Sequence, residues 1–466
     1  MTVRIFRHYV PTPMLLLGAV EGLLLTLAVY AGVWVLVHQG FPTGNAVLDP
    51  LLPRALLFPA IFLSTMSAAG LYEIGLRDGA QGIAIRLAAS FLAGGLLLGL
   101  LFYTFPRLYI GGLAFAASLT IAAVAVVATR LVYYAIVDHE VLKRRILVLG
   151  AGPQANLVEQ RLRRHSDRRG LTIVGYVHTR LEQDVVPRSK LLKVETTLLE
   201  LAERHRCSEI VIALDDRRSN FPIDDLIECK MSGIRVIDLL TFFERQTGTI
   251  PLDVLQPVHI VFLDGFSHAV LRNTGKRVFD LLASLGMLLV TLPVFLGTAL
   301  AIKLEEGWRA PVFYRQDRVG RKGQLFKVIK FRSMRTDAER HGAQWATRND
   351  PRVTRVGGFI RKVRVDELPQ LWNVLQGDMS FVGPRPERPE FVNDLQHKIP
   401  YYSLRHRVDP GITGWAQVRY PYGSSERDAK EKLQYDLYYI KNYSMFLDLA
   451  ILFQTVQVIL SGQGAR

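Results

Sequence analysis

Cysteine is nearly absent from this chain, which has two in 466 residues. Cys207 and Cys229 stand apart and show none of the paired spacings of a zinc site, and two thiols make no disulfide framework. This scarcity excludes a fold organised by disulfides or by structural zinc, and it fits a reducing cytosol around the soluble part of the chain.

Acidic residues are few relative to basic ones. The chain has 42 Asp and Glu against 57 Lys and Arg, which gives a formal net charge of +15 and a pI of about 9.8. Such a balance calls for nucleic acid, anionic lipid head groups or a phosphorylated substrate as partner. Because 49% of the residues are hydrophobic and several apolar runs are long, we expect membrane lipids and no nucleic acid.

Charged residues are rare in four apolar runs of the first 140 residues. Each run is near the roughly 20 residues that a helix needs to cross the hydrocarbon core. A cleavage site is lacking after the first run, which favours a retained anchor over a signal peptide. Its one acid, Glu21, is either a proton or substrate site or an acid packed between helices. The runs are Met14 to Val37, Ala55 to Leu71, Leu87 to Phe105 and Leu108 to Thr129.

Basic residues are unevenly divided between the loops that join these runs. Lys and Arg remain on the cytoplasmic side of a membrane, so their distribution sets the orientation. We expect a four-span region over residues 1–140, with the N-terminus and everything after the fourth span in the cytoplasm. One side carries Arg4, Arg7, Arg77, Arg86, Lys143, Arg144 and Arg145, and the other carries only Arg54 and Arg107.

The middle of the chain alternates short apolar runs with helical segments, which is typical of a parallel sheet with crossover helices. We therefore predict an α/β Rossmann-like, CoA-binding-like domain over residues 141–268. Its first turn, GAGPQA, places Gly150 and Gly152 as in a dinucleotide fingerprint. The acid expected after the second strand is missing, because His178 stands there. The glycines either bind a nucleotide or only form a tight turn.

A fifth apolar run, Leu281 to Ile302, is also long enough to span. A simple span would leave the basic C-terminal third outside, and Pro293 within the run would break a helix. A re-entrant helical hairpin over residues 277–303, with both ends in the cytoplasm, accounts for the charges and for the proline. Basic residues flank the run on both sides, namely Lys276, Arg277, Lys303 and Arg309.

Two adjacent carboxylates, Asp366 and Glu367, stand in the segment RVDELPQLWNVLQG. The spacing of its apolar residues predicts a helix, with Gly377 as its stop and Pro369 in its first turn. The carboxylates therefore lie at the start of a helix. By themselves they would be read as a helix cap that interacts favourably with the helix dipole.

The surrounding motifs change that interpretation. Four segments resemble, in order, the bacterial sugar transferase family of monotopic polyprenyl-phosphate phosphoglycosyl transferases, and KRVFD at Lys276 to Asp280 opens the proline-broken run. The resemblance covers about Asn273 to the C-terminus, and we expect an α/β catalytic domain over 270–466. The layout in front resembles that of the large members of the family. The segments are YRQDRVGRKGQLFKVIKFRSM, DPRVTRVGGFIRKVRVDELPQ, GDMSFVGPRPE and PGITGWAQV.

The resemblance implies transfer of a phospho-sugar from a UDP-sugar to undecaprenyl phosphate, with release of UMP, at the bacterial inner (cytoplasmic) membrane. This would be the initiating step of exopolysaccharide, capsule or O-antigen synthesis. The resemblance makes Asp366 the nucleophile and Glu367 a ligand of Mg²⁺. Arg361 and the helix amides would keep a carboxylate ionised and favour phosphate beside it. Which sugar is moved stays open between glucose, galactose and an N-acetylated sugar.

Further basic residues are expected at the substrate phosphates. Arg385 lies between two prolines that hold its backbone, and the family places a phosphate-binding arginine there; a surface salt bridge is the alternative. Lys330 and Arg332 are either phosphate or structural contacts. Arg277 and Asp280 either pair at the mouth of the hairpin or take part in catalysis. The tail, Leu447 to Leu460, is either an interfacial helix or a core helix.

Tyrosine is lacking where the main alternative function needs it. A membrane-anchored NAD-dependent nucleotide-sugar epimerase or dehydratase would use a Tyr-x-x-x-Lys, yet Tyr176 is the only tyrosine between Arg145 and Val270. A scaffold that grips anionic lipid would leave the Asp366 and Glu367 pair without a role. As further partners we expect a second copy of the chain and downstream glycosyltransferases.

Overall fold

The computed structural model contains two compact units, one with most of residues 1–247 and the other with residues 248–466 together with 5–8. Among the residues that the structure describes, five helices are long and apolar enough to cross a membrane. The expected domain boundaries near 140 and 268, and the basic residues Arg7 and Arg77, lie outside the described residues. The structure describes residues 2–5, 8–38, 51–72, 80–137, 143–162, 168, 170–178, 185–193, 197–215, 221–262, 270–335, 350–420, 423 and 425–460.

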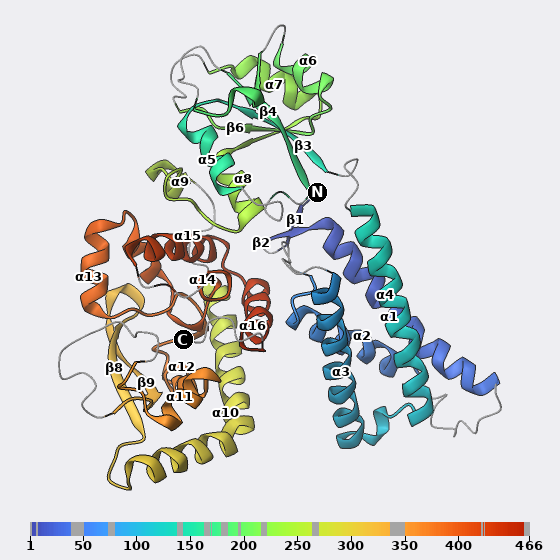
Figure 1. The fold of residues 1–466 in the computed structure, drawn as a ribbon, viewed down its shortest axis with the longest axis vertical. Helices are drawn as coiled ribbons and strands as arrows, with labels where there is room; N and C mark the ends of the chain where they lie inside the picture. Colours follow the sequence, from blue (N-terminus) through green and yellow to red (C-terminus); the bar gives the residue numbers. More distant parts are fainter. Residues whose placement is uncertain are drawn as a thin grey trace. The chain divides into compact units, whose positions relative to one another are not determined.

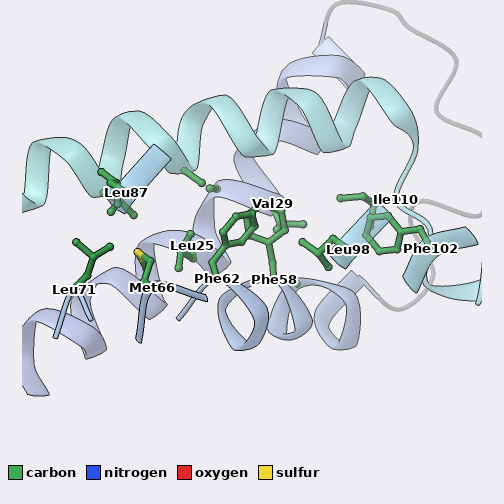
Figure 2. Packing of buried hydrophobic residues seen from close by; sticks show 14 residues of the cluster. Leu25, Val29, Phe58, Phe62, Met66, Leu71, Leu87, Leu98, Phe102 and Ile110 are labelled. Carbon is green, nitrogen blue, oxygen red and sulfur yellow. The ribbon is translucent and has the colours of Figure 1, made fainter. Parts of the chain in front are cut away.

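Four of the apolar helices lie in the first unit, after the paired strands β1 (Thr2–Ile5) and β2 (His8–Pro11). Their packed interior contains Phe58 and Phe62, whose ring centroids are 4.7 Å apart, and Figure 2 shows this cluster. At Gly32 an added Cβ would collide with Ser118, so glycine allows two helices to approach closely. The helices are α1 (Thr12–His38), α2 (Leu51–Ala68), α3 (Ala80–Thr104) and α4 (Gly112–Val137).

A buried ion pair connects α1 with α4. Glu21 is fully buried and its Oε1 lies 2.7 Å from Arg130 Nε. Tyr72 donates a hydrogen bond to the same carboxylate, and Arg130 also donates to the Leu71 carbonyl at 3.2 Å. Of the two interpretations of Glu21, these contacts favour an acid packed between helices. Its partner was missed because α4 continues past Thr129, the expected end of the run, to Val137.

A five-stranded parallel sheet follows in the same unit, with the order β5-β4-β3-β6-β7. Helices α6 and α7 pack on one face, and Figure 1 shows α5 and α8 on the other. Both cysteines are buried and free. The strands are β3 (Arg144–Leu149), β4 (Leu171–Val177), β5 (Leu191–Leu192), β6 (Glu209–Ile212) and β7 (Arg235–Asp238), and the helices are α5 (Pro153–Arg161), α6 (Leu198–Arg204), α7 (Ile223–Met231) and α8 (Leu239–Thr247).

The second unit surrounds two small strand pairs with helices. β8 and β9 form an antiparallel hairpin, while β10 and β11 run parallel. The strands are β8 (Phe313–Val319), β9 (Leu325–Phe331), β10 (Ser380–Val382) and β11 (Gly411–Thr413). The helices are α9 (Pro257–Phe262), α10 (Val270–Glu306), α11 (Arg355–Lys362), α12 (Gln370–Gln376), α13 (Pro389–Lys398), α14 (Trp415–Arg419), α15 (Glu426–Asn442) and α16 (Met445–Leu460), with 3-10 turns η7 (Val365–Glu367) and η8 (Tyr402–Arg407) among them.

Helix α10 contains the fifth apolar run and has Pro293 inside it. Figure 1 shows its ribbon turning sharply partway along, and the helix continues from Val270 to Glu306 without a hairpin loop. Before the proline, Arg277 donates to the Val374 and Leu375 carbonyls. After it, Ile302 packs with Phe331 and other residues of the second unit. Both halves of the bent helix are therefore held by the same unit.

The expected pair of Arg277 with Asp280 is wrong. Arg277 donates to main-chain carbonyls of α12, while Asp280 accepts from the Phe381 amide at 3.1 Å and lies 4.0 Å from Lys276 Nζ. Lys276 in turn contacts Asp448 of α16 at 2.7 Å. Tertiary partners thus take the place of the local pair, because main-chain groups of α12 and β10 face α10 there. In α16, Leu447 and Ile451 are fully buried, so one face of the tail is core.

Candidate active site

Asp366 and Glu367 lie on the 3-10 turn η7, directly before α12. The expectation of one continuous helix is wrong in detail, because Pro369 caps α12 and Arg364 before the turn has a left-handed φ of 61°. Gly377 ends α12 as expected, with a φ of 97°. The 3-10 turn has about three residues per turn, so it directs adjacent side chains to different sides.

Glu367 is surrounded by cations. Its Oε1 lies 3.0 Å from Lys330 Nζ and 2.9 Å from Arg385 Nη2, and Arg364 is 3.8 Å away. Burial by itself would raise the pKa of Glu367, but these charges outweigh it and hold the pKa well below its usual range. Glu367 is therefore an ionised carboxylate throughout the physiological pH range.

Asp366 has a different environment from its neighbour. Its side chain is buried, and no cation makes a described ion pair with it. Burial raises the pKa of Asp366; the Lys330 ammonium opposes this shift, and the Glu367 carboxylate adds to it. Arg364 and Arg361 contribute weaker opposing charges. A carboxylate with a raised pKa is more basic and more nucleophilic, so the environments separate two adjacent acids into different roles.

Arg385 connects the acidic pair with the segment that follows β10. Its Nη1 donates to Gln417 Oε1 at 2.8 Å, and its main-chain carbonyl accepts from Arg405 Nη2 at 2.9 Å. Arg405 is buried and paired with Asp436 at 3.0 Å. Sequence reasoning singled out Arg385 but missed these three supporting residues. Gln417 lies within the quoted segment PGITGWAQV, which was the available signal for it.

Lys330 is brought to Glu367 by a buried amide that was also missed. Asn373 in α12 accepts a hydrogen bond from the Ile329 amide at 3.0 Å and donates to the Lys327 carbonyl at 2.8 Å. These two bonds attach β9 to α12 directly before Lys330. Asn373 stands in the quoted stretch LWNVLQG, where it interrupts an otherwise apolar helix face.

Two other expected phosphate contacts lie elsewhere. Arg332 is 3.6 Å from Glu306 at the end of α10, which makes it a structural contact of that helix. Arg361 lies on α11 and reaches the site through its charge on Asp366. Its role at a phosphate stays a prediction.

The glycine turn of the first unit lies against the carboxylate of Asp215. The Gln154 amide at the start of α5 donates to Asp215 Oδ1 at 3.0 Å. A Cβ added at Gly152 would collide with the same carboxylate, and Gly150 has a φ of 123°. A dinucleotide phosphate at this helix terminus would meet the negative charge of Asp215, so the contacts favour a tight turn over a nucleotide site.

The Glu367 carboxylate fits a magnesium site that is completed by substrate. Among the described residues no group of three or more His, Cys, Asp and Glu could hold a metal ion. Mg²⁺ is, however, commonly held by one or two carboxylates together with substrate phosphates. The described contacts of Glu367 fall on Oε1, so its other oxygen suits such a cation.

Comparison with known proteins gives a consistent result for the second unit. A model of the bacterial sugar transferase family matches residues 271–462. The chain is 44% identical over 187 residues to the exopolysaccharide production protein PSS of Rhizobium leguminosarum bv. phaseoli, which covers 39% of this chain and 92% of that protein.

Longer relatives extend the match beyond this region. A UDP-N-acetylgalactosamine-undecaprenyl-phosphate N-acetylgalactosaminephosphotransferase of Aeromonas hydrophila is 44% identical over 241 residues, or 52% of this chain and 56% of that protein. A UDP-glucose:undecaprenyl-phosphate glucose-1-phosphate transferase of Escherichia coli is 36% identical over 264 residues, 56% of each. The chain thus spans little more than half the length of these two relatives.

Proposed function

The chain belongs to the bacterial sugar transferase family, and on this premise we propose that it transfers a phospho-sugar from a UDP-sugar to undecaprenyl phosphate and releases UMP. The names of its relatives support the donor and the acceptor. One observation in the structure supports it most. Asp366 and Glu367 are adjacent, yet in the described part of the chain Lys330 and Arg385 form ion pairs with Glu367 and none is formed with Asp366. Glu367 is therefore suited to bind a cation, and Asp366 is suited to attack.

The proposed reaction proceeds in two displacements. The Asp366 carboxylate attacks the phosphorus that carries the sugar, the bond to the bridging oxygen breaks, and UMP leaves with that electron pair. A phosphate oxygen of undecaprenyl phosphate then attacks the acyl phosphate and restores the Asp366 carboxylate. One diphosphate linkage is broken and one is made, so the exchange needs no energy source.

The cations of the site would neutralise the negative charge of the substrate phosphates. Arg385 and Lys330 hold Glu367 and lie where phosphate oxygens would gather. We propose Glu367 as the protein ligand of Mg²⁺, which leaves the Asp366 carboxylate available for attack. When bound, the ion would neutralise negative charge on the diphosphate.

The membrane arrangement is part of the same proposal. The apolar helices α1 to α4 would span the inner membrane, and the parallel sheet would form a Rossmann-like cytoplasmic domain. The bent α10 would enter and leave on the cytoplasmic side, which is supported by the attachment of both halves to one unit. A second copy of the chain and downstream glycosyltransferases are the further partners we propose.

A direct assay tests the function. Full-length protein in detergent, with undecaprenyl phosphate and Mg²⁺, is given UDP-glucose, UDP-galactose and their N-acetylated forms, and release of UMP is followed. We expect release with at least one donor, loss of it in Asp366→Asn, and no change in the exposed control Asp224→Asn. If no UDP-sugar yields UMP, the proposal is wrong.

A further inference from the structure

A cavity of about 300 Å³ lies in the second unit between α13, η8 and α15. Its wall combines the aromatic rings of Phe391 and Tyr402 with charged side chains, and Ala429 of α15 also lines it. The charged residues are Glu387, Asp394, Lys398, Arg405, Glu426 and Lys432. Aromatic rings beside polar groups that can fix the orientation of a ligand are typical of a small-molecule site.

The cavity is joined to the acidic pair through a single residue. The Arg385 side chain reaches Glu367, while its main-chain carbonyl accepts a hydrogen bond from Arg405 in the cavity wall. Glu387, another wall residue, follows in the same segment. Lys432 interacts electrostatically with Glu387 in the cavity wall and with Arg385. Burial lowers the pKa of Lys432, the Glu387 charge opposes this shift, and the Arg385 charge adds to it. The cavity therefore lies at the backbone end of Arg385, and the carboxylates lie at its guanidinium end.

This placement distinguishes between the two ends of a nucleotide-sugar. In the proposed reaction the sugar is attached to the phosphorus that Asp366 attacks, whereas the nucleoside is one phosphate further away. A cavity separated from the carboxylates by the length of Arg385 suits the more distant group. We propose that the cavity binds the nucleoside of the donor, an inference that rests on the proposed function.

The wall chemistry agrees with a pyrimidine nucleoside. Rings such as Phe391 offer a face for stacking a base. Glu387 can accept hydrogen bonds from ribose hydroxyls, and an ammonium such as that of Lys432 has three donors for the carbonyl oxygens of the base. The volume is at the lower end of the range for ligand pockets, which begins at about 300 Å³, so it suits a nucleoside and not a whole nucleotide-sugar.

The wall is also held in place by contacts between its own residues. Arg405 donates to the Tyr402 hydroxyl at 2.6 Å and is paired with Asp436, and both arginine and tyrosine are buried. A preformed wall reduces the ordering that binding requires.

Binding measurements on the full-length protein test this assignment without turnover. The probes are UMP, a sugar 1-phosphate and inorganic diphosphate, measured by calorimetry in detergent. Ala429→Phe fills the cavity, and Phe391→Ala removes a ring from it. Phe359→Ala makes the same change on an exposed ring of α11 and is the control. We expect the two cavity variants to weaken UMP binding at least tenfold and to leave diphosphate binding as in the control.

The outcomes separate this inference from the proposed function. Unchanged UMP affinity in both cavity variants would overturn it, and so would weaker sugar 1-phosphate binding with normal UMP binding. If Ala429→Phe fails to fold, Phe391→Ala decides by the same criteria. Should the unmodified protein bind neither UMP nor diphosphate, the proposed UDP-sugar donor fails and the nucleoside site with it.

Discussion

Replacing Lys330 by methionine should slow the reaction and change its pH dependence. At the 3.0 Å between Lys330 Nζ and Glu367 Oε1, two unit charges interact by about 5 kcal/mol in an effective dielectric constant of about 20. Arg385 and Arg364 remain beside Glu367 and compensate in part. We therefore expect a loss of about 3 kcal/mol in transition-state stabilisation, which corresponds to roughly 10²-fold in kcat.

The pH profile gives a second readout. Attack requires the ionised form of Asp366, whose pKa burial raises, so kcat should fall as the pH drops through that pKa. Lys330 is the largest charge that opposes the rise. Without it the pKa of Asp366 goes up further, and the acid limb of the kcat profile should move to higher pH.

The assay is UMP release across a pH series, with saturating donor and acceptor. Lys327→Met makes the same change at an exposed position of the same strand and should keep the original rate and profile. A normal rate with an unmoved acid limb in Lys330→Met would refute the electrostatic reasoning for both carboxylates.

Three other predictions concern the covalent step, the hairpin and the helix bundle. Protein given UDP-sugar without acceptor should gain the mass of a phospho-sugar on the peptide with Asp366, which hydroxylamine removes; absence of any adduct by mass spectrometry would make the attack direct. Single cysteines at Asn273 and at the exposed Trp308 should both react with an impermeant reagent added from the cytoplasmic side, whereas labelling from opposite sides would contradict the hairpin. Glu21→Gln leaves Arg130 buried without its counter-charge, so it should lower stability by about 3–5 kcal/mol in a thermal unfolding assay; Glu21→Gln with Arg130→Met should recover part of this loss, and equal stability of the single variant would rule out a structural role for the pair.

Patterns with a short period were predicted well from the sequence. The apolar runs became helices because roughly 20 apolar residues admit few other folds, and the alternation after Arg145 became the parallel sheet. Gly377 was identified as a helix stop because a left-handed C-cap favours glycine. Each of these signals depends on residues that are neighbours along the chain.

Contacts between distant segments were not predictable in the same way. Arg277 and Asp280 are close in sequence, and their local pairing was a reasonable expectation, yet main-chain groups more than 90 residues away bind them instead. Arg405 and Asn373 carry no motif that marks them as supports of the site. Their importance follows from which carbonyls and amides they reach once the chain is folded.

The acidic pair depends both on the local sequence and on contacts between distant segments. The sequence makes Asp366 and Glu367 chemically similar and adjacent, so nothing local assigns them different tasks. Their separation comes from β9 and the segment after β10, which bring Lys330 and Arg385 to the same oxygen of Glu367. Asp366 is buried beside this neutralised neighbour, and no residue that the structure describes forms an ion pair with it. In the double variant Asp366→Glu with Glu367→Asp, the shorter side chain at 367 withdraws its carboxylate from Lys330 and Arg385, and the longer side chain at 366 displaces the attacking oxygen. UMP release should therefore be lost although composition and local charge are unchanged. Retained UMP release in that double variant would show that the separation of the two roles does not depend on these cation contacts.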